Sequence, residues 1–268
     1  MLGFVIAFRA KRKSKNWEED FSLLKNTLKS VCNQEDQNFK VYLVYTDLPK
    51  IEMHPKILPL KFPYEFIEKK ELFDAAILHD PQYDVENNKR VEFDYDKSKR
   101  ILFGCNAARK DRCDFIMSVD ADDLISNRIA GFVNSNLSEK FGWFVDIGYI
   151  RTGTNQLLIR VKNGLSDING SSNIVRTDFI PMPDFNSRLV SDFAFFHWHS
   201  WLKHRLKKQF NDTLKPLPFS GTIYVLHDSS LSGYKGFLKK QFIKTFFKYI
   251  MYGEWLTQKK RKEFAANS

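Results

Sequence analysis

The sequence predicts an α/β fold in which helices flank a mixed, mostly parallel sheet. The first apolar run, residues 4–8, indicates a buried strand, and between residues 17 and 31 apolar side chains recur at spacings of four, three, four and three, as on one face of a helix. Residues 39–45 then alternate β-branched and aromatic side chains, and Leu48-Pro49 closes the run. A strand, a helix and a strand in this order form a parallel crossover unit.

The next elements are less regular. Residues 50–97 carry four prolines and many charges, which indicates a surface excursion around one short strand. A helix is expected from Ser98, its capping residue, to about Lys110, with Lys99 and Arg100 on its solvent side. Short apolar runs between turn signals predict the remaining strands, at residues 58–62, 115–119, 143–149 and 156–161.

Three carboxylates, Asp120, Asp122 and Asp123, directly follow one of these apolar strands. Clustered carboxylates repel one another and resist burial unless a cation joins them. Mg²⁺ and Mn²⁺ suit such a site, because they keep several waters and take further ligands from phosphates. Since open α/β sheets bind ligands beyond the carboxyl ends of their strands, the motif predicts a divalent-cation site there. Alternatively, Asp122 or Asp123 merely caps a helix that begins near Leu124.

The net charge of +10 belongs to the last quarter of the chain. Residues 201–268 hold 14 Lys or Arg against 4 Asp or Glu, whereas residues 1–200 hold 28 of each. Over residues 234–250 lysines alternate with aromatic and aliphatic side chains, which predicts an amphipathic helix that packs on the domain or lies on an anionic membrane surface. A solvated basic face is the simpler alternative. No nucleic-acid recognition motif accompanies the charge, so we expect no nucleic-acid partner.

The length predicts one main domain, residues 1–233, followed by the basic helical segment 234–268. Three cysteines, an odd number without metal-finger spacing, fit a reducing compartment. The apolar opening is short and its positive charges follow it, unlike those of a signal peptide, and no stretch reaches the roughly 18 uncharged residues of a membrane span. We therefore expect a cytoplasmic protein whose tail allows peripheral contact with the inner face of the cell membrane.

Four segments spread over residues 1–233 resemble the nucleotide-sugar glycosyltransferases of the GT-A fold, in particular the broad family-2-like group of bacteria. The segments are Ala7-Phe8-Arg9, Ser30-Val31-Cys32-Asn33-Gln34 with the following Phe39-Lys40-Val41, Asp120-Ala121-Asp122-Asp123, and the run from Gly221 to Gly233. The resemblance implies a GT-A-like, Rossmann-like fold. It also implies a nucleotide-diphosphate sugar as the donor, with a UDP-sugar as the first candidate, and Mn²⁺ or Mg²⁺ as the cofactor.

The resemblance also implies roles for the acidic motif. In such enzymes the first Asp of a D-x-D element contacts the nucleotide ribose and the last holds the metal that bridges the diphosphate, which by position are Asp120 and Asp122. His227 resembles the late histidine that completes the metal site, and a neutral imidazole suits manganese. The alternative is a structural histidine at a strand end, with its hydrogen bonds made to neighbouring groups. The turn at residues 169–172 resembles the segment that approaches the donor sugar or the acceptor, or is a simple turn.

Further binding residues follow from the same resemblance. Asp47 would face the nucleobase, unless it is only a turn residue, and Ala7 and Arg9 would line the nucleotide pocket. Lys99 and Arg100 lie where a basic side chain could reach the diphosphate, although a solvated helix face is the alternative for either.

The sequence departs from the family pattern at the catalytic base. Inverting members commonly carry a Glu-Asp pair at the start of a helix, and here the candidate is Asp192 alone. We expect Asp192 to deprotonate the acceptor hydroxyl, with His197 and His199 as alternatives.

These observations predict a metal-dependent glycosyltransferase, inverting by resemblance, that transfers a sugar to a glycan or lipid-linked acceptor in surface polysaccharide synthesis. One alternative is a nucleotidyltransferase of related fold, which attacks phosphorus instead of the sugar carbon. Another is a basic membrane-surface adaptor or binding module, in which the aspartates only cap a helix. A phosphatase with an aspartate nucleophile is disfavoured, because Asp123 stands where Thr or Val is expected.

Overall fold

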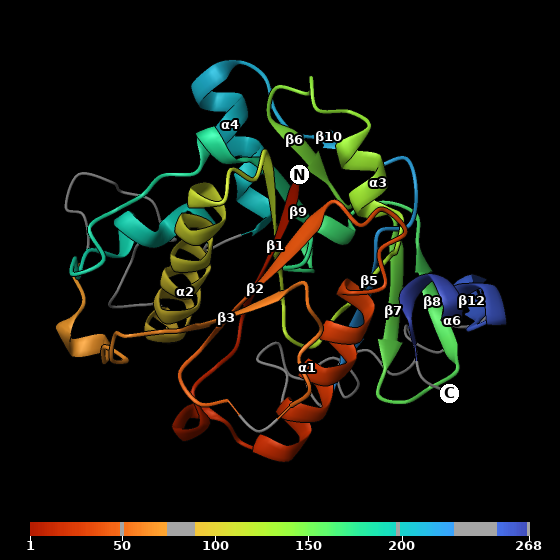
Figure 1. Cartoon of the computed structure of the whole chain (residues 1–268), viewed down its shortest axis with the longest axis horizontal. Coiled ribbons are helices and arrows are strands. Elements are labelled where there is room, and N and C mark those ends of the chain that lie inside the picture. Colours follow the sequence, from red (N-terminus) through yellow and green to blue (C-terminus); the bar gives the residue numbers. More distant parts are fainter. Residues whose placement is uncertain (49–50, 74–88, 197–198, 228–250, 267–268) are drawn as a thin grey trace.

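The computed structural model describes residues 1–48, 51–73, 89–196, 199–227 and 251–266. The strands in these ranges form two sheets (Figure 1). The first sheet has seven strands in the order β10-β6-β9-β4-β1-β2-β3, and the second has five in the order β12-β8-β7-β11-β5. Both sheets take strands from distant parts of the chain.

The first sheet is mixed and mostly parallel. Its strands β3, β2, β1 and β4 are parallel neighbours, as are β10 and β6, whereas β9 runs antiparallel to β4 and β6. The order β3-β2-β1-β4 is that of a Rossmann-like half, so the predicted fold class is confirmed. The strands are β1 Leu2–Ala7, β2 Phe39–Tyr45, β3 Ile57–Lys61, β4 Phe115–Val119, β6 Gly142–Phe144, β9 Asn173–Arg176 and β10 Lys215–Pro216.

Two helices cover opposite faces of the parallel strands, α1 at Trp17–Val31 and α2 at Val91–Lys110 (Figure 1). Alternation along β1 explains this, because successive side chains of a strand point to opposite faces. Phe4 belongs to the core cluster that contains the apolar face of α1, and Val5 to the cluster that contains that of α2. A Cβ at Gly104 would lie 2.5 Å from Cγ1 of Val5, so this glycine lets α2 approach the sheet closely.

The second sheet includes the end of the chain. Its strands are β5 Leu124–Ile125, β7 Gly148–Thr152, β8 Leu157–Val161, β11 Thr222–Leu226 and β12 Gly253–Trp255. Helix α6, Gln258–Phe264, covers one face, where fully buried Phe264 joins Tyr149 and Leu158 in one cluster. Residues 253–255, which form strand β12, lie inside the segment 234–268 that was predicted to be helical. The expected helix over 234–250 and the boundary after residue 233 lie outside the described residues.

The remaining elements are short. Two are α-helices, α3 at Ile129–Asn134 and α4 at Leu202–Phe210. The 3-10 helices are η1 Lys11–Lys13, η2 Lys69–Glu71, η4 Leu165–Asp167, η5 Thr177–Phe179, η6 Val190–Phe196 and η7 His199–Trp201. In the part of the chain that the structure describes, no helix has both the length and the apolar character needed to cross a membrane.

Three predicted boundaries were wrong. The helix expected from Ser98 begins at Val91, and Ser98 is buried in its interior. The helix expected from Leu124 is preceded by β5, which pairs with β11, and begins only at α3. The strand expected over 143–149 divides into β6 and β7, which belong to different sheets. Local pattern does not reveal which sheet a short apolar run joins, because tertiary pairing decides it.

Candidate active site: an acidic cluster facing a basic helix

A cavity of about 450 Å³ opens beyond the carboxyl ends of β1 and β4. The loop after β1, one face of α2, the acidic motif after β4 and the end of β11 contribute to its wall. Among the predicted site residues, those that line it are Ala7, Arg9, Arg100, Asp120, Asp122 and His227. This is the position at which open α/β sheets bind ligands.

The three aspartates form one cluster, in which one carboxylate oxygen from each lies within 4.8 Å of the others. Asp123 is fully buried and accepts hydrogen bonds from Ser171 Oγ at 2.6 Å and from the backbone N–H of Val225 at 3.1 Å. Burial, together with the charges of Asp122 and Asp120, raises the pKa of Asp123 well above its usual range. Asp123 thus ties the motif to the second sheet, while Asp120 and Asp122 face the cavity.

The turn at residues 169–172 holds the acidic motif through hydrogen bonds. Ser171 Oγ accepts the backbone N–H of Asp120 at 2.8 Å, in addition to its bond to Asp123. Its own N–H donates to Asn169 Oδ1 at 2.7 Å. At Gly170 a Cβ would lie 2.4 Å from Asp120 Oδ2, so the absence of a side chain there makes room for the carboxylate. In the described structure this turn therefore positions Asp120.

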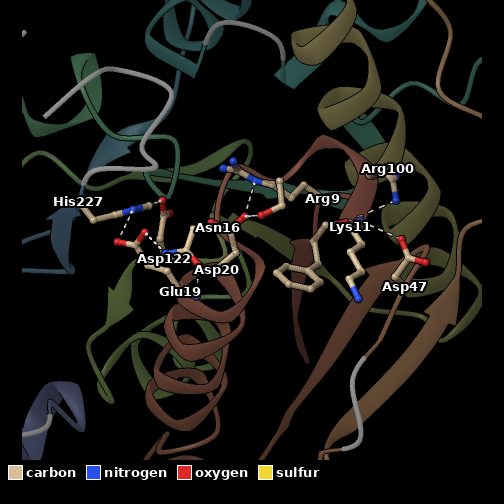
Figure 2. A network of polar contacts seen from close by, with 11 residues as sticks. Arg9, Lys11, Asn16, Glu19, Asp20, Asp47, Arg100, Asp122 and His227 are labelled. Atoms are coloured by element: carbon tan, nitrogen blue, oxygen red, sulfur yellow. Dashed lines mark hydrogen bonds and ion pairs between the residues drawn. The ribbon is translucent and has the colours of Figure 1, made fainter. Parts of the chain in front are cut away.

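His227 follows β11 and reaches the motif from the second sheet. Its Nε2 lies 2.8 Å from Asp122 Oδ2, and its Nδ1 lies 3.8 Å from Glu19 Oε1 of α1 (Figure 2). The imidazole is buried, whereas the Asp122 side chain remains 24% exposed at the cavity. Carboxylate oxygens and an imidazole nitrogen this close together are a donor set that fits Mn²⁺. These residues therefore suit the divalent cation that the sequence predicts.

Basic side chains from α2 and from the loop after β1 line the same cavity, and one of them contacts the acidic motif. Lys97 Nζ lies 2.7 Å from Asp120 Oδ1, and Arg100 binds Asp96 through Nε at 2.7 Å. The guanidinium of Arg9 lies 3.6 Å from Asp20 (Figure 2). Lys97 was missed by the sequence analysis. The spacing of three residues from Arg100 places both on one helix face, and a helix start at Val91 would have revealed it.

An aromatic wall completes the cavity. Phe66 and Phe93 line it with their ring centroids 5.5 Å apart, and Lys13 Nζ lies 3.8 Å from the Phe66 ring centroid. These residues come from the irregular region before α2 and from its first turns, where the sequence carried no motif. Flat apolar rings of this kind can stack against a planar ligand group.

Three predicted site residues are not among the described residues that line the cavity: Asp47, Lys99 and Asp192. Lys99 is buried against the rings of Tyr64 and Phe193, and burial lowers its pKa, so the predicted solvent side for Lys99 was wrong. Arg100 is likewise buried, although it reaches the cavity. Asp47 accepts the backbone N–H of Lys11 at 2.8 Å and so holds the loop after β1 (Figure 2).

Asp192, the predicted catalytic base, lies in η6, which packs against α2. It accepts a hydrogen bond from Ser187 Oγ, and its charge, after burial, contributes to raising the pKa of Tyr95 on α2. It is not among the described residues that line the cavity. Its role as the base stays a prediction of the sequence, as do the alternatives: His197 lies outside the described residues, and η7 begins with His199.

Comparisons with known proteins give structural likeness only. No family model matches the chain, and no curated protein matches it. Crystal structures of S. aureus TarS are similar: TarS 1-349 is 12% identical, with a TM-score of 0.39, over 84% of this chain and 60% of that chain. TarS 1-349 in complex with UDP-GlcNAc is 10% identical, with a TM-score of 0.43, over 97% of this chain and 69% of that one. The chain spans 37% of the longer TarS structure, so activity is argued below from the residues of the cavity.

Proposed function

We propose that the protein is a metal-dependent glycosyltransferase that moves a sugar from a nucleoside-diphosphate donor, with inversion at the sugar carbon. The observation that carries this proposal is that Asp120, Asp122 and His227 line the same cavity as Lys97 and Arg100. The first three can hold a divalent cation, and the other two supply positive charge for a diphosphate. A volume of about 450 Å³ is within the range of small-molecule sites.

Transfer of the sugar requires both the cation ligands and the basic side chains of this cavity. Negative charge develops on the departing nucleoside diphosphate as the sugar passes through an oxocarbenium-like state. Asp122 and His227 would hold the cation, which supplies a Lewis acid that stabilises this charge when it is bound. Lys97 and Arg100 add positive charge to the same wall, and Asp120 is placed to contact the ribose or the cation.

The nucleobase would lie against the loop after β1. Ala7 and Arg9 line the cavity there, and Asp47 holds this loop through its bond to Lys11 N–H. The rings of Phe66 and Phe93 offer a surface on which a planar base can stack. We propose a UDP-sugar as the donor, with the base selected by this part of the wall.

The identity of the released nucleotide tests the reaction class. We expect the protein with Mn²⁺ to release a nucleoside diphosphate slowly from one of UDP-, GDP- or CDP-sugars when water replaces the acceptor, and faster with a suitable glycan or lipid-linked acceptor. Chromatography of the nucleotide products provides the measurement, with EDTA as the control. Pyrophosphate release from a nucleoside triphosphate and a sugar phosphate would instead identify a nucleotidyltransferase and contradict the proposal.

We further propose that the acceptor is glycan or lipid-linked, in surface polysaccharide synthesis, and that the protein meets it at an anionic membrane surface in the cytoplasm. Trp255, at the end of the edge strand β12, and Met251, just before this strand, are each 68% exposed, and Tyr252 is 42% exposed. Lys259 and Lys262 are exposed on the neighbouring α6. Exposed Trp and Tyr beside lysines are typical of segments that lie at a lipid interface.

A vesicle assay tests this contact. We expect the protein to sediment with phosphatidylglycerol-containing vesicles but not with phosphatidylcholine vesicles, and Trp255→Gln with Tyr252→Gln to reduce the bound fraction. Leu137→Gln, which removes an exposed apolar side chain elsewhere, is the matched control. Equal binding by the double variant and the wild type would exclude this surface as the contact.

A further inference from the structure

Lys97 is a basic residue that contacts the proposed cation site directly. It lies on α2, lines the cavity, and places its ammonium 2.7 Å from Asp120 Oδ1. Its side chain is 39% exposed, so it has room to move. A lysine ammonium ordinarily loses its proton only at about pH 10, and here it is paired with a carboxylate. Lys97 therefore stays charged at neutral pH.

The ammonium and a divalent cation compete for the same carboxylate. Asp120 and Asp122 both belong to the acidic cluster, so an ion held there comes close to the ammonium of Lys97. The ammonium and the cation would share one carboxylate and so lie close together. Two positive charges this near repel strongly in a partly buried cavity, where screening by water and salt is weak. The ion pair between Lys97 and Asp120 therefore opposes binding of the cation alone.

A diphosphate offers Lys97 a second anionic partner. Lysine carries a compact charge on a flexible four-carbon stem, so its ammonium can turn within the cavity without movement of the helix. Arg100, one turn further along α2, lines the same wall and would contribute to the same anion. When the ammonium turns to the diphosphate, Asp120 is released for the cation.

We propose that Lys97 is a positioning residue that couples the two ligands: it blocks Asp120 in the ligand-free protein and leaves it when a nucleoside diphosphate binds. This inference rests on the proposed function. Coupling of this kind is reciprocal, so the cation must strengthen nucleotide binding by the same factor by which the nucleotide strengthens cation binding. Lys97 would thus keep the cation site weak until the donor arrives.

Lys97→Met tests the coupling, because it keeps the apolar stem and removes the charge. Mn²⁺ affinity is measured by electron paramagnetic resonance, without nucleotide and with UDP, after allowance for the Mn²⁺–UDP complex in solution. We expect Lys97→Met to bind Mn²⁺ alone about fivefold more tightly or better than the wild type, and to show a smaller gain on addition of UDP. Lys110→Met, at the exposed end of the same helix, removes the same charge and should behave as the wild type.

The outcome separates this inference from the proposed function. Equal or weaker binding of Mn²⁺ alone by Lys97→Met would overturn the role of Lys97, whatever the nucleotide does. Failure of the wild type to bind any nucleoside diphosphate would overturn the proposed function, while the comparison with Mn²⁺ alone would still decide whether Lys97 blocks Asp120. Lys97→Gln repeats the measurement if circular dichroism shows that Lys97→Met is misfolded.

Discussion

Asp122→Asn is expected to lower the rate of nucleoside-diphosphate release by about a hundred- to a thousand-fold, the loss typical of removing one group that stabilises developing charge. Asp122 is the carboxylate that lines the cavity with Oδ2 2.8 Å from His227 Nε2, so the substitution removes one anionic ligand from the proposed cation site. The amide keeps the size and shape of the carboxylate and can still bond to His227. The rate is measured with the donor at saturation and with Mn²⁺ in excess.

The same variant is expected to be at least as stable as the wild type when EDTA is present. One carboxylate oxygen from each of Asp120, Asp122 and Asp123 lies within 4.8 Å of the others, so without a cation the carboxylates repel, and burial together with this repulsion raises the pKa of Asp123. Asp178→Asn, at an exposed position away from the cavity, is the matched control for both measurements. A rate within a few-fold of the wild type would remove Asp122 from the cation site.

Gly170→Ala is expected to weaken Mn²⁺-dependent nucleotide binding and to reduce turnover by about a hundred-fold, as small displacements of positioned groups can do. The added Cβ would lie 2.4 Å from Oδ2 of Asp120 and 3.0 Å from its Cγ, so the carboxylate must move. Since the colliding atoms belong to a side chain, the backbone can stay in place. The melting temperature is therefore expected to change little.

Gly131→Ala in α3 controls for the loss of a glycine, because a Cβ there meets its nearest neighbour at an ordinary 3.6 Å. Both variants are compared by calorimetry for nucleotide affinity and by thermal unfolding for stability. If Gly170→Ala bound nucleotide like Gly131→Ala, the position of Asp120 would not matter for the site.

Much of the site could be predicted from the sequence because a strand carries its last residues to the edge of its sheet. An apolar strand that ends in Asp120 and Asp122 places them where parallel strands end, with no need to know the rest of the fold. Ala7 and Arg9 were suggested by the resemblance to GT-A glycosyltransferases, and their place at the end of β1 agrees with the same rule. His227 required the resemblance to GT-A glycosyltransferases, because the sequence distance between it and Asp122 carries no signal of contact.

The basic wall could not be predicted to the same accuracy. Whether Lys97, Lys99 or Arg100 faces the cavity depends on where α2 begins and on which rings pack against it. Tyr64 and Phe193, which enclose Lys99, come from segments far away in sequence, so its burial is a tertiary effect. Asp192 was selected by its position before a plausible helix, but the contacts of its carboxylate depend on folding of the region around Ser187.

Titration of the protein with UDP, GDP and CDP by calorimetry, with and without Mn²⁺ and alongside Asp122→Asn, tests the central claim most directly. The proposed site predicts that one nucleoside diphosphate binds, that binding depends on Mn²⁺, and that Asp122→Asn loses this dependence. Absence of nucleotide binding under every condition would contradict the account and favour the adaptor interpretation, in which the aspartates have only a structural role.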